Sequence, residues 1–372
     1  MAKKGSLAMA FDNIIGQEKW TKFLLDAWKK KRLAHAILIS GPLGSGKEFL
    51  ALELAKLLNC PEEENGACGS CSSCRRISSL EHPNVQFVFP LPGGKSRSDS
   101  KNKSADPLYG LSEEVLETIQ LEMIKKAKNP YHRIEIPKAK FIRIDSIRHL
   151  RENAYLKSAE PGKKVIILSR TEMMNDEAAN SFLKLLEEPP SDTFIFLTTS
   201  KPNSLIPTIR SRCQEIKLKG LTDDQVMEQL VSFGERAEEV RTVSKIVEGD
   251  ISKALKLLEE GEFEERSAIA DELVAAIRSG SASDIVAMNR KLTGLSSEGK
   301  EKLADIFQIS LRLILGGGIV DISRITGSKI AEQFDKAIDL VGRNIYIPMI
   351  FSALVFESRM LLKMSDNKGG RR

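Results

Sequence analysis

A glycine-rich turn between a buried strand and a helix constrains this chain most. The segment Gly41–Lys47 reads GPLGSGK, follows the apolar run Ala36–Ser40 and leads into a helical pattern over Phe49–Leu58. Without a strand in front, these letters would describe an ordinary glycine turn. A strand, a glycine loop and a helix in this order predict a phosphate-binding loop, because backbone N–H groups at the helix N-terminus face phosphate oxygens. The residues expected to hold phosphate are Gly41, Gly44, Gly46 and Lys47.

The residues that would bind magnesium beside such a loop are missing. The position after the lysine normally carries a Ser or Thr hydroxyl, and here it is Glu48. The second nucleotide-binding element is a strand that ends in acidic residues, but the strand-like run KVIILS ends at Ser169 and continues with Arg170. Neither side chain binds a metal or acts as a general base. Glu172, beyond the strand end, is the alternative carboxylate. We therefore expect weak ATP or anion binding at most, and no intrinsic ATP hydrolysis.

Four of the five cysteines are separated by seven, two and two residues. Overlapping CxxC turns of this kind present thiolates to one tetrahedral ion, and four thiolates leave no open position for water. The pattern therefore predicts a structural zinc ion. An iron–sulfur cluster and free thiols are the alternatives, although the run lacks the further Cys-Pro of bacterial ferredoxins. The predicted ligands are Cys60, Cys68, Cys71 and Cys74.

Hydrophobic periodicity changes once along the chain. The first part alternates apolar strand-like runs with helical stretches, which indicates a parallel sheet covered by helices. After Gly220 the pattern is helical throughout, and Thr222 with Gln225 forms a capping box that opens the first of these helices. The predicted domains are an α/β domain over residues 1–219, a small helical domain over 220–262 and a second helical domain over 263–372.

Residues 91–140 are predicted to be an insertion in the α/β domain. The stretch Pro90–Pro107 carries almost no apolar side chains and is expected to be mobile, whereas Leu111–Lys128 predicts an amphipathic helix. Lys125–Arg143 holds seven Lys or Arg residues, one acidic residue and two aromatic rings. Such runs occur where proteins contact nucleic acid, but they are more often a solvated face, and we predict the latter.

Composition and hydropathy exclude several classes of protein. With 372 residues, 41% of them hydrophobic and 29% charged, the chain has enough apolar material for two or three folded domains. Its net charge of +5 is too mild to identify a dedicated nucleic-acid-binding protein. The longest apolar run, Ile345–Phe356, is shorter than the roughly 20 residues of a membrane span, and the first residues lack a signal-type apolar segment. We expect a cytoplasmic protein without membrane contact.

Taken together, the motifs resemble the delta-prime subunits of bacterial DNA polymerase III clamp loaders, which belong to the AAA+ superfamily. The matching segments are FDNIIGQ at 11–17, HAILISGPLGSGK at 35–47, the four-cysteine module, AANSFLKLLEEPP at 178–190 and TIRSRCQEI at 208–216. The match is close over residues 11–90 and 141–216. The insertion departs from the family pattern, and the helical remainder matches in size and order more than in motif.

This resemblance implies an AAA+ architecture: a P-loop NTPase-like parallel-sheet domain with a zinc module, a small helical lid and a helical collar. It also implies a role for the family's Ser-Arg-Cys motif, which falls on Ser211, Arg212 and Cys213. Arg212 would be an arginine finger that reaches the ATP site of a neighbouring ATPase subunit. The arginine of the lid helix found in active relatives falls near Ser252, whose side chain carries no charge.

The function expected from these features is that of a non-hydrolysing clamp-loader subunit within the DNA polymerase III holoenzyme. The implied partners are ATPase subunits and a delta-type subunit in a five-membered ring, the sliding clamp, and primed DNA held by the complex. Two other functions stay open: an active gamma-type ATPase, and a zinc-dependent nucleic-acid-binding protein with a relic phosphate loop. Magnesium-dependent turnover by the isolated chain would favour the first of these, and tight, salt-sensitive DNA binding the second.

Overall fold

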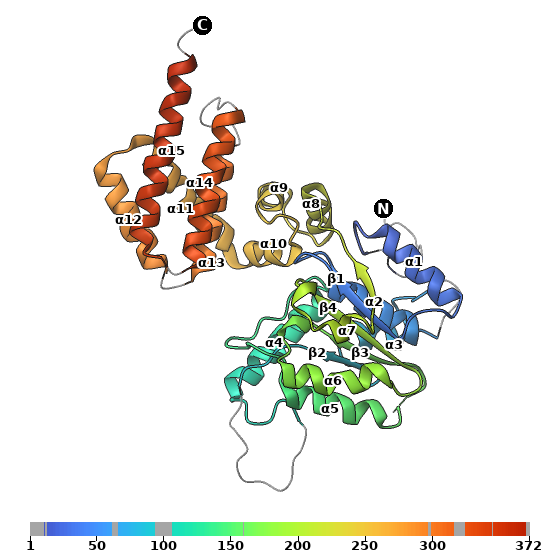
Figure 1. Ribbon diagram of the computed structural model, residues 1–372. Coiled ribbons are helices and arrows are strands. Elements are labelled where there is room, and N and C mark those ends of the chain that lie inside the picture. The colour runs from blue at the N-terminus through green and yellow to red at the C-terminus, as the bar shows by residue number, and fades with distance from the viewer. Residues whose placement is uncertain are drawn as a thin grey trace. The chain divides into compact units, whose positions relative to one another are not determined.

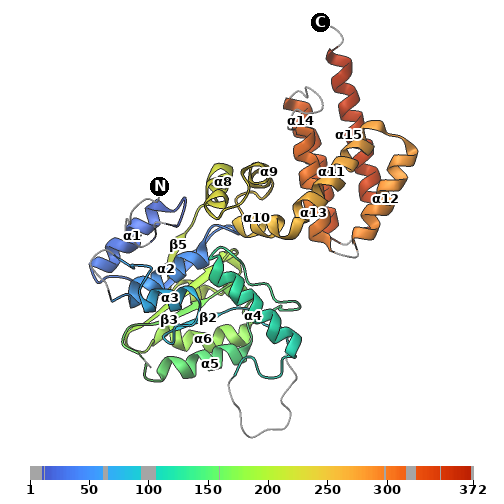
Figure 2. The same ribbon diagram turned by 180° about the vertical axis from the view of Figure 1, so that it is seen from behind.

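The structure is a computed structural model that divides into two compact units (Figures 1 and 2). It describes residues 11, 13–61, 66–93, 106–158, 160–296, 299–315, 324–343 and 345–369. The first unit comprises residues 1–233 and 248–253, and the second comprises residues 234–247 and 254–372. The predicted boundaries of separate lid and collar domains stay a prediction.

A five-stranded parallel sheet lies at the centre of the first unit. Its strands are β1 (Ala36–Ser40), β2 (Val85–Val88), β3 (Lys164–Leu168), β4 (Thr193–Thr199) and β5 (Gln214–Lys217). They are ordered β2-β3-β4-β1-β5, and every neighbouring pair is parallel. The three inner strands are almost entirely buried, because helices cover both faces of the sheet. The predicted α/β fold with a parallel sheet is confirmed.

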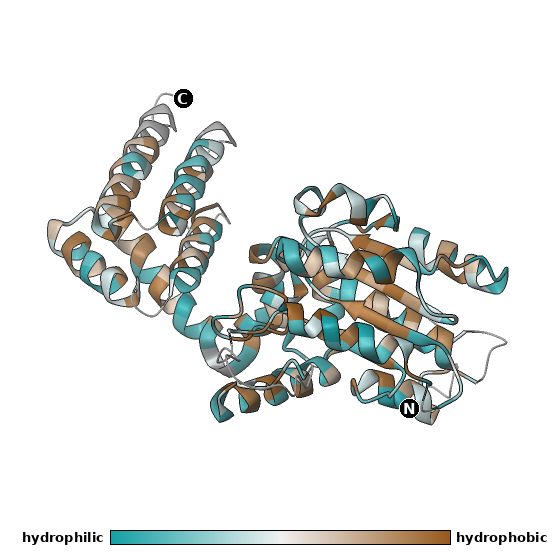
Figure 3. Cartoon of the chain, turned by 60° about the horizontal axis from the view of Figure 1, so that its bottom comes forward, coloured by the Kyte–Doolittle hydropathy of each residue, from teal (hydrophilic) through white to brown (hydrophobic). Residues whose placement is uncertain are grey.

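Helices connect these strands, and because crossovers between parallel strands are almost always right-handed, the direction of each step across the sheet decides which face a helix covers. The helices of this unit are α1 (Glu18–Lys29), α2 (Lys47–Asn59), α3 (Ser72–Ser78), α4 (Glu113–Lys128), α5 (Ile144–Tyr155), α6 (Asp176–Glu187), α7 (Pro207–Arg210) and α8 (Asp223–Ser232). On one face, α5 and α6 bury Leu150 and Phe182 against Ile166 and Leu197. The other face is covered by α2, which contacts β1, β3 and β4. Figure 3 shows the resulting apolar sheet between helices whose outer faces are polar.

The insertion contains the predicted amphipathic helix, α4, and a small core of its own. Ile119 of α4 packs with Phe89, Ile134 and Ile136 in an apolar cluster next to β2. This cluster fastens residues 106–142 to the sheet domain. Most of the stretch predicted to be mobile, residues 94–105, lies outside the described residues.

The described part of the second unit consists of helices joined by short connections. It contains α9 (Ala237–Ile246), most of α10 (Ile251–Leu258), α11 (Glu262–Ser279), α12 (Ala282–Ser296), α13 (Lys300–Leu315), α14 (Arg324–Gly342) and α15 (Ile347–Gly369). Phe307 and Phe334 meet edge to face in its core, with ring centroids 6.4 Å apart. Arg266 and Asp305 form a buried ion pair between α11 and α13. None of the helices in the described part of the chain has both the length and the apolar character needed to cross a bilayer.

Candidate functional sites

The glycine-rich loop has the predicted shape between β1 and α2. Gly44 and Gly46 have φ angles of 68° and 84°, in the left-handed region that favours glycine, and α2 begins directly after Gly46. A Cβ atom at Gly44 would lie 2.3 Å from the Cα atom of Asp250, so no larger residue fits there. The Lys47 ammonium donates a hydrogen bond of 2.9 Å to the carbonyl oxygen of Gly41. The loop lysine is therefore bonded to its own loop.

Lys47 sits in a shielded and largely acidic environment. Burial lowers the pKa of Lys47 to about 8, and the nearby carboxylates of Glu48, Asp250 and Glu172 oppose that shift. The ammonium thus loses its proton more readily than an exposed lysine does.

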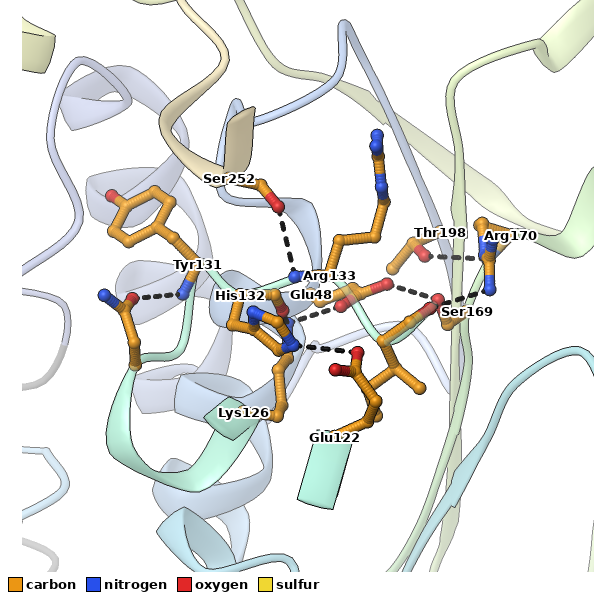
Figure 4. Close-up of polar contacts among 12 residues, drawn as sticks. Glu48, Glu122, Lys126, Tyr131, His132, Arg133, Ser169, Arg170, Thr198 and Ser252 are labelled. Atoms are coloured by element: carbon orange, nitrogen blue, oxygen red, sulfur yellow. Dashed lines mark hydrogen bonds and ion pairs between the residues drawn. The ribbon is translucent and has the colours of Figure 1, made fainter. Parts of the chain in front are cut away.

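Glu48, at the position where a hydroxyl would bind magnesium, is fully engaged inside the protein. Its carboxylate pairs with Lys126 of α4 and accepts a hydrogen bond from the Ser169 hydroxyl at the end of β3 (Figure 4). The Lys126 side chain is 1% exposed and also donates a 2.7 Å hydrogen bond to the carbonyl oxygen of His132. Burial alone would raise the pKa of Glu48, but Lys126 and Ser169 outweigh it and hold the pKa below its usual value. Glu48 is therefore an anion whose charge is neutralised within the chain.

The end of β3 supplies no carboxylate to the loop. The Arg170 guanidinium donates to the carbonyl oxygen of Ile134 at 2.9 Å. Glu172, the alternative carboxylate, does line the cavity beside the loop, but one of its oxygens accepts hydrogen bonds from the N–H and hydroxyl of Ser200, at 3.3 and 2.9 Å. The cavity has a volume of about 50 Å³, space for a few water molecules. The structure thus brings the loop, Ser169, Arg170, Glu172 and Ser252 together around a small, partly open space.

The four predicted metal ligands form one cluster between α2 and α3. Their sulfur atoms all lie within 4.8 Å of one another. Backbone N–H groups of Cys68, Cys71 and Cys74 donate to the sulfurs of Cys60, Cys68 and Cys71 at 3.3–3.4 Å, which favours thiolates. Sulfurs bound to one zinc ion at about 2.3 Å lie roughly 3.8 Å apart, so this cluster fits a structural zinc ion after slight contraction. An iron–sulfur cluster distributes its cysteines over several irons and requires wider spacing.

Arg212 lies on the surface immediately after α7. Its guanidinium, 36% exposed, forms a 2.6 Å ion pair with Glu187 at the end of α6 and donates to the carbonyl oxygen of Thr208 at 3.0 Å. Of its neighbours in the motif, Ser211 is exposed, and burial raises the pKa of Cys213 to about 12. Arg212 is not among the described residues that line the loop cavity of its own chain. It is accessible from outside.

The prediction that the basic run 125–143 is a solvated face is wrong for Lys126, which is buried, and for Arg143, which bonds to the carbonyl oxygen of Pro107. The sequence carried two signals for Lys126. It follows Ile119 by seven residues, so it falls on the buried face of the predicted helix. An acidic residue after the loop lysine also requires a buried cation nearby.

Comparisons with known proteins show which family the chain matches. A family model described as "DNA polymerase III, delta subunit" matches residues 16–222. DNA polymerase III subunit delta' of Bacillus subtilis is 31% identical over 252 residues, which cover 68% of this chain and 62% of that protein. The delta' subunit of Pseudomonas aeruginosa is 32% identical over 181 residues, 48% of this chain and 42% of that protein. Subunit tau of B. subtilis is 28% identical over 67% of this chain and 37% of that protein.

A solved structure of a gamma subunit-related protein from Thermotoga maritima has a TM-score of 0.48 and 16% identity, and the match covers 91% of this chain and 99% of that one. The chain spans less than two thirds of the length of each of the three curated relatives.

Proposed function

This chain belongs to the DNA polymerase III delta-subunit family, and from that premise we propose that it is a clamp-loader subunit that hydrolyses no ATP itself and donates Arg212 to a neighbouring ATPase subunit. The observation that carries the proposal is that the Glu48 carboxylate is paired inside the protein. The carboxylate occupies the magnesium-binding position and is neutralised by Lys126 and Ser169, so the loop holds an internal ion pair where a metal would bind.

Hydrolysis in P-loop enzymes depends on a magnesium ion held by a hydroxyl and a carboxylate, and on a group that orients water. In this chain the hydroxyl of Ser169 binds Glu48, and Arg170 follows where an acidic residue would stand. Glu172 is the remaining carboxylate at the cavity, and Ser200 already occupies one of its oxygens. These contacts support a site that does not turn over ATP, and they disfavour the gamma-type alternative.

Arg212 has the chemistry of a group that acts on a neighbour's nucleotide. A guanidinium is planar, permanently charged and able to form two parallel hydrogen bonds to phosphate oxygens. Its exposure and its position outside the loop cavity of its own chain leave it accessible to a partner. Glu187 holds the guanidinium in place, and the greater negative charge of a γ-phosphate would draw it away from that single carboxylate.

The second unit supports assembly with other subunits. Along α15, Met349, Phe356 and Met360 recur at intervals of seven and four residues and are 58%, 64% and 43% exposed. Exposed apolar side chains along one face of a helix are typical of a surface that another protein buries. We assign this face to a collar that joins the ATPase subunits and a delta-type subunit in a five-membered ring. Through that ring the chain would act with the sliding clamp on primed DNA in the cytoplasm, while the zinc ion stabilises the fold.

ATPase assays on the isolated chain and on the reconstituted complex test this function. The isolated chain should show no magnesium-dependent turnover. Arg212→Ala should lower ATP turnover of the complex about a thousandfold while leaving its assembly intact, because an arginine finger contributes about that factor. Arg210→Ala, at the end of α7 two residues before Arg212, is the matched control and should retain activity. Turnover by the isolated chain would instead support the gamma-type alternative.

A further inference from the structure

The proposed function leaves the insertion without a role, yet residues 129–135, here called the crossing segment, lie directly against the phosphate loop. The Tyr131 side chain, 5% exposed, is packed so closely on the loop that a Cβ atom at Gly46 would be 3.1 Å from its ring. The ring also meets Phe49 of α2 edge to face, with centroids 5.2 Å apart, and Phe233 at 6.3 Å. An aromatic ring of the chain itself thus covers the start of α2.

The crossing segment contacts two more elements around the same cavity (Figure 4). The backbone N–H of Arg133 donates to the Ser252 hydroxyl at 3.2 Å, and its guanidinium lies 3.8 Å from the carboxylate of Asp250. The carbonyl oxygen of Ile134 accepts the hydrogen bond from Arg170 at the end of β3. The segment therefore joins the loop, the end of β3 and the turn that begins α10.

Hydrogen bonds to α4 hold the crossing segment in this position. Glu122 accepts from the backbone N–H of Glu135 and pairs with the His132 ring, both at 2.9 Å. Lys126 joins the carbonyl oxygen of His132 to Glu48 of the loop. The segment is thus anchored at several points along its length.

We propose that the crossing segment is a built-in occupant of the phosphate-loop pocket, which bridges the three surrounding elements in place of a nucleotide. Its Tyr131 ring fills the space beside Gly46, and Lys126 supplies the cation that Glu48 requires. Because the occupant is part of the same chain, its effective concentration is far higher than that of a free ligand. A nucleotide must displace Tyr131 before it reaches the loop. This inference does not depend on the role of Arg212.

Hydrogen exchange of the full-length protein tests the bridge. Tyr131→Ala should raise amide exchange at least about tenfold in two peptides far apart in sequence, 42–50 and 249–253, because both lose the same support. Exchange in β4 should not change. Tyr131→Phe keeps the ring and should behave as the wild type, as should Lys128→Ala, an exposed control on α4. Increased exchange confined to residues 129–135 would overturn the proposal.

A second variant covers the case in which Tyr131→Ala unfolds the sheet domain, which faster exchange in β4 would reveal. Arg133→Ala removes a side chain that is 23% exposed and should raise exchange in 249–253 without affecting β4. Unchanged amide exchange in 249–253 would overturn the proposal that the crossing segment supports these residues.

Adding ATP or ADP with magnesium tests the occupancy directly. In the wild type, either the nucleotide leaves exchange in 42–50 unchanged, or it protects 42–50 while exposing 129–135, and both results support a resident occupant. In Tyr131→Ala the nucleotide should protect 42–50 more strongly than in the wild type. Protection of 42–50 in the wild type with 129–135 undisturbed would show that the pocket is free, which contradicts the proposal.

Discussion

Glu48 shows how one residue changes what a phosphate loop does. The glycines still form the turn, but a carboxylate in place of a hydroxyl attracts Lys126 from a helix 78 residues further along the chain. A buried ion pair of this kind is costly to break, because the remaining charge is left without a partner in a poorly solvated place. The same pair that occupies the metal position therefore also holds the insertion against the sheet domain.

Removing one member of this pair should destabilise the first unit. Lys126→Met should lower its free energy of unfolding by about 3–5 kcal/mol, because Glu48 stays buried without its cation. The double variant Glu48→Leu, Lys126→Met should recover most of this loss. Denaturant unfolding followed by the fluorescence of Trp20 and Trp28, both in α1, measures the effect. Lys128→Met is the exposed control, and an equal loss in that variant would contradict the argument.

The lowered pKa of Lys47 makes stability depend on pH in a defined direction. Between about pH 8 and pH 10.5 the unfolded chain binds the lysine proton and the folded chain does not, so stability rises with pH across this window. Relative to Lys47→Met, the wild type should gain up to about 3 kcal/mol in free energy of unfolding from about pH 7 to about pH 10.5. Unfolding curves of both proteins at several pH values measure the difference. A constant difference across the window would show that Lys47 is not shielded.

At the scale of elements, the cysteine cluster connects the end of α2 to the start of α3. Cys60 directly follows α2, and Cys71 caps α3 by accepting the backbone N–H of Cys74. A metal ion bound at this point would fix both helix ends and, through α2, would support the phosphate loop. With a metal bound, the cluster would thus hold in place the helix that carries the candidate nucleotide site.

We expect the purified chain to contain one zinc ion, measurable by elemental analysis. Cys71→Ser or removal of the metal with a chelator should lower Tm of the first unit by roughly 10 °C or more, a loss of a few kcal/mol. Cys213→Ser changes the one cysteine outside the cluster and should retain the metal. Visible absorption from an iron–sulfur cluster, or unchanged melting after metal removal, would refute the assignment.

Sequence patterns predicted the elements whose signals are local. The buried strands, the glycine loop and the cysteine spacing each lie within a few consecutive residues. The edge strands β2 and β5 are short and half-buried or largely exposed, so their apolar patterns were too weak to predict. The pair between Glu48 and Lys126, and the path of Tyr131 across the loop, depend on contacts between distant segments. Periodicity within one helix cannot specify such contacts.

On the scale of the whole molecule, the phosphate-loop cavity and the Arg212 side chain lie in different surroundings. The cavity beside the loop is small, and several of its polar side chains are bonded within the chain, as Lys126 is to Glu48 and Glu172 is to Ser200. Arg212 lies elsewhere on the surface with one carboxylate partner. In the proposed function, the chain would supply one guanidinium to a complex, and a neighbouring subunit would carry out the nucleotide chemistry.

The central proposal is that this chain supplies Arg212 while a neighbouring subunit hydrolyses ATP. Single-turnover ATP hydrolysis by the reconstituted complex carrying Arg212→Lys tests it most directly. Lysine keeps the positive charge but lacks the planar fork that binds two phosphate oxygens. The account predicts that the complex assembles normally and loses most of its hydrolysis rate. Hydrolysis at the wild-type rate by the assembled Arg212→Lys complex would contradict it.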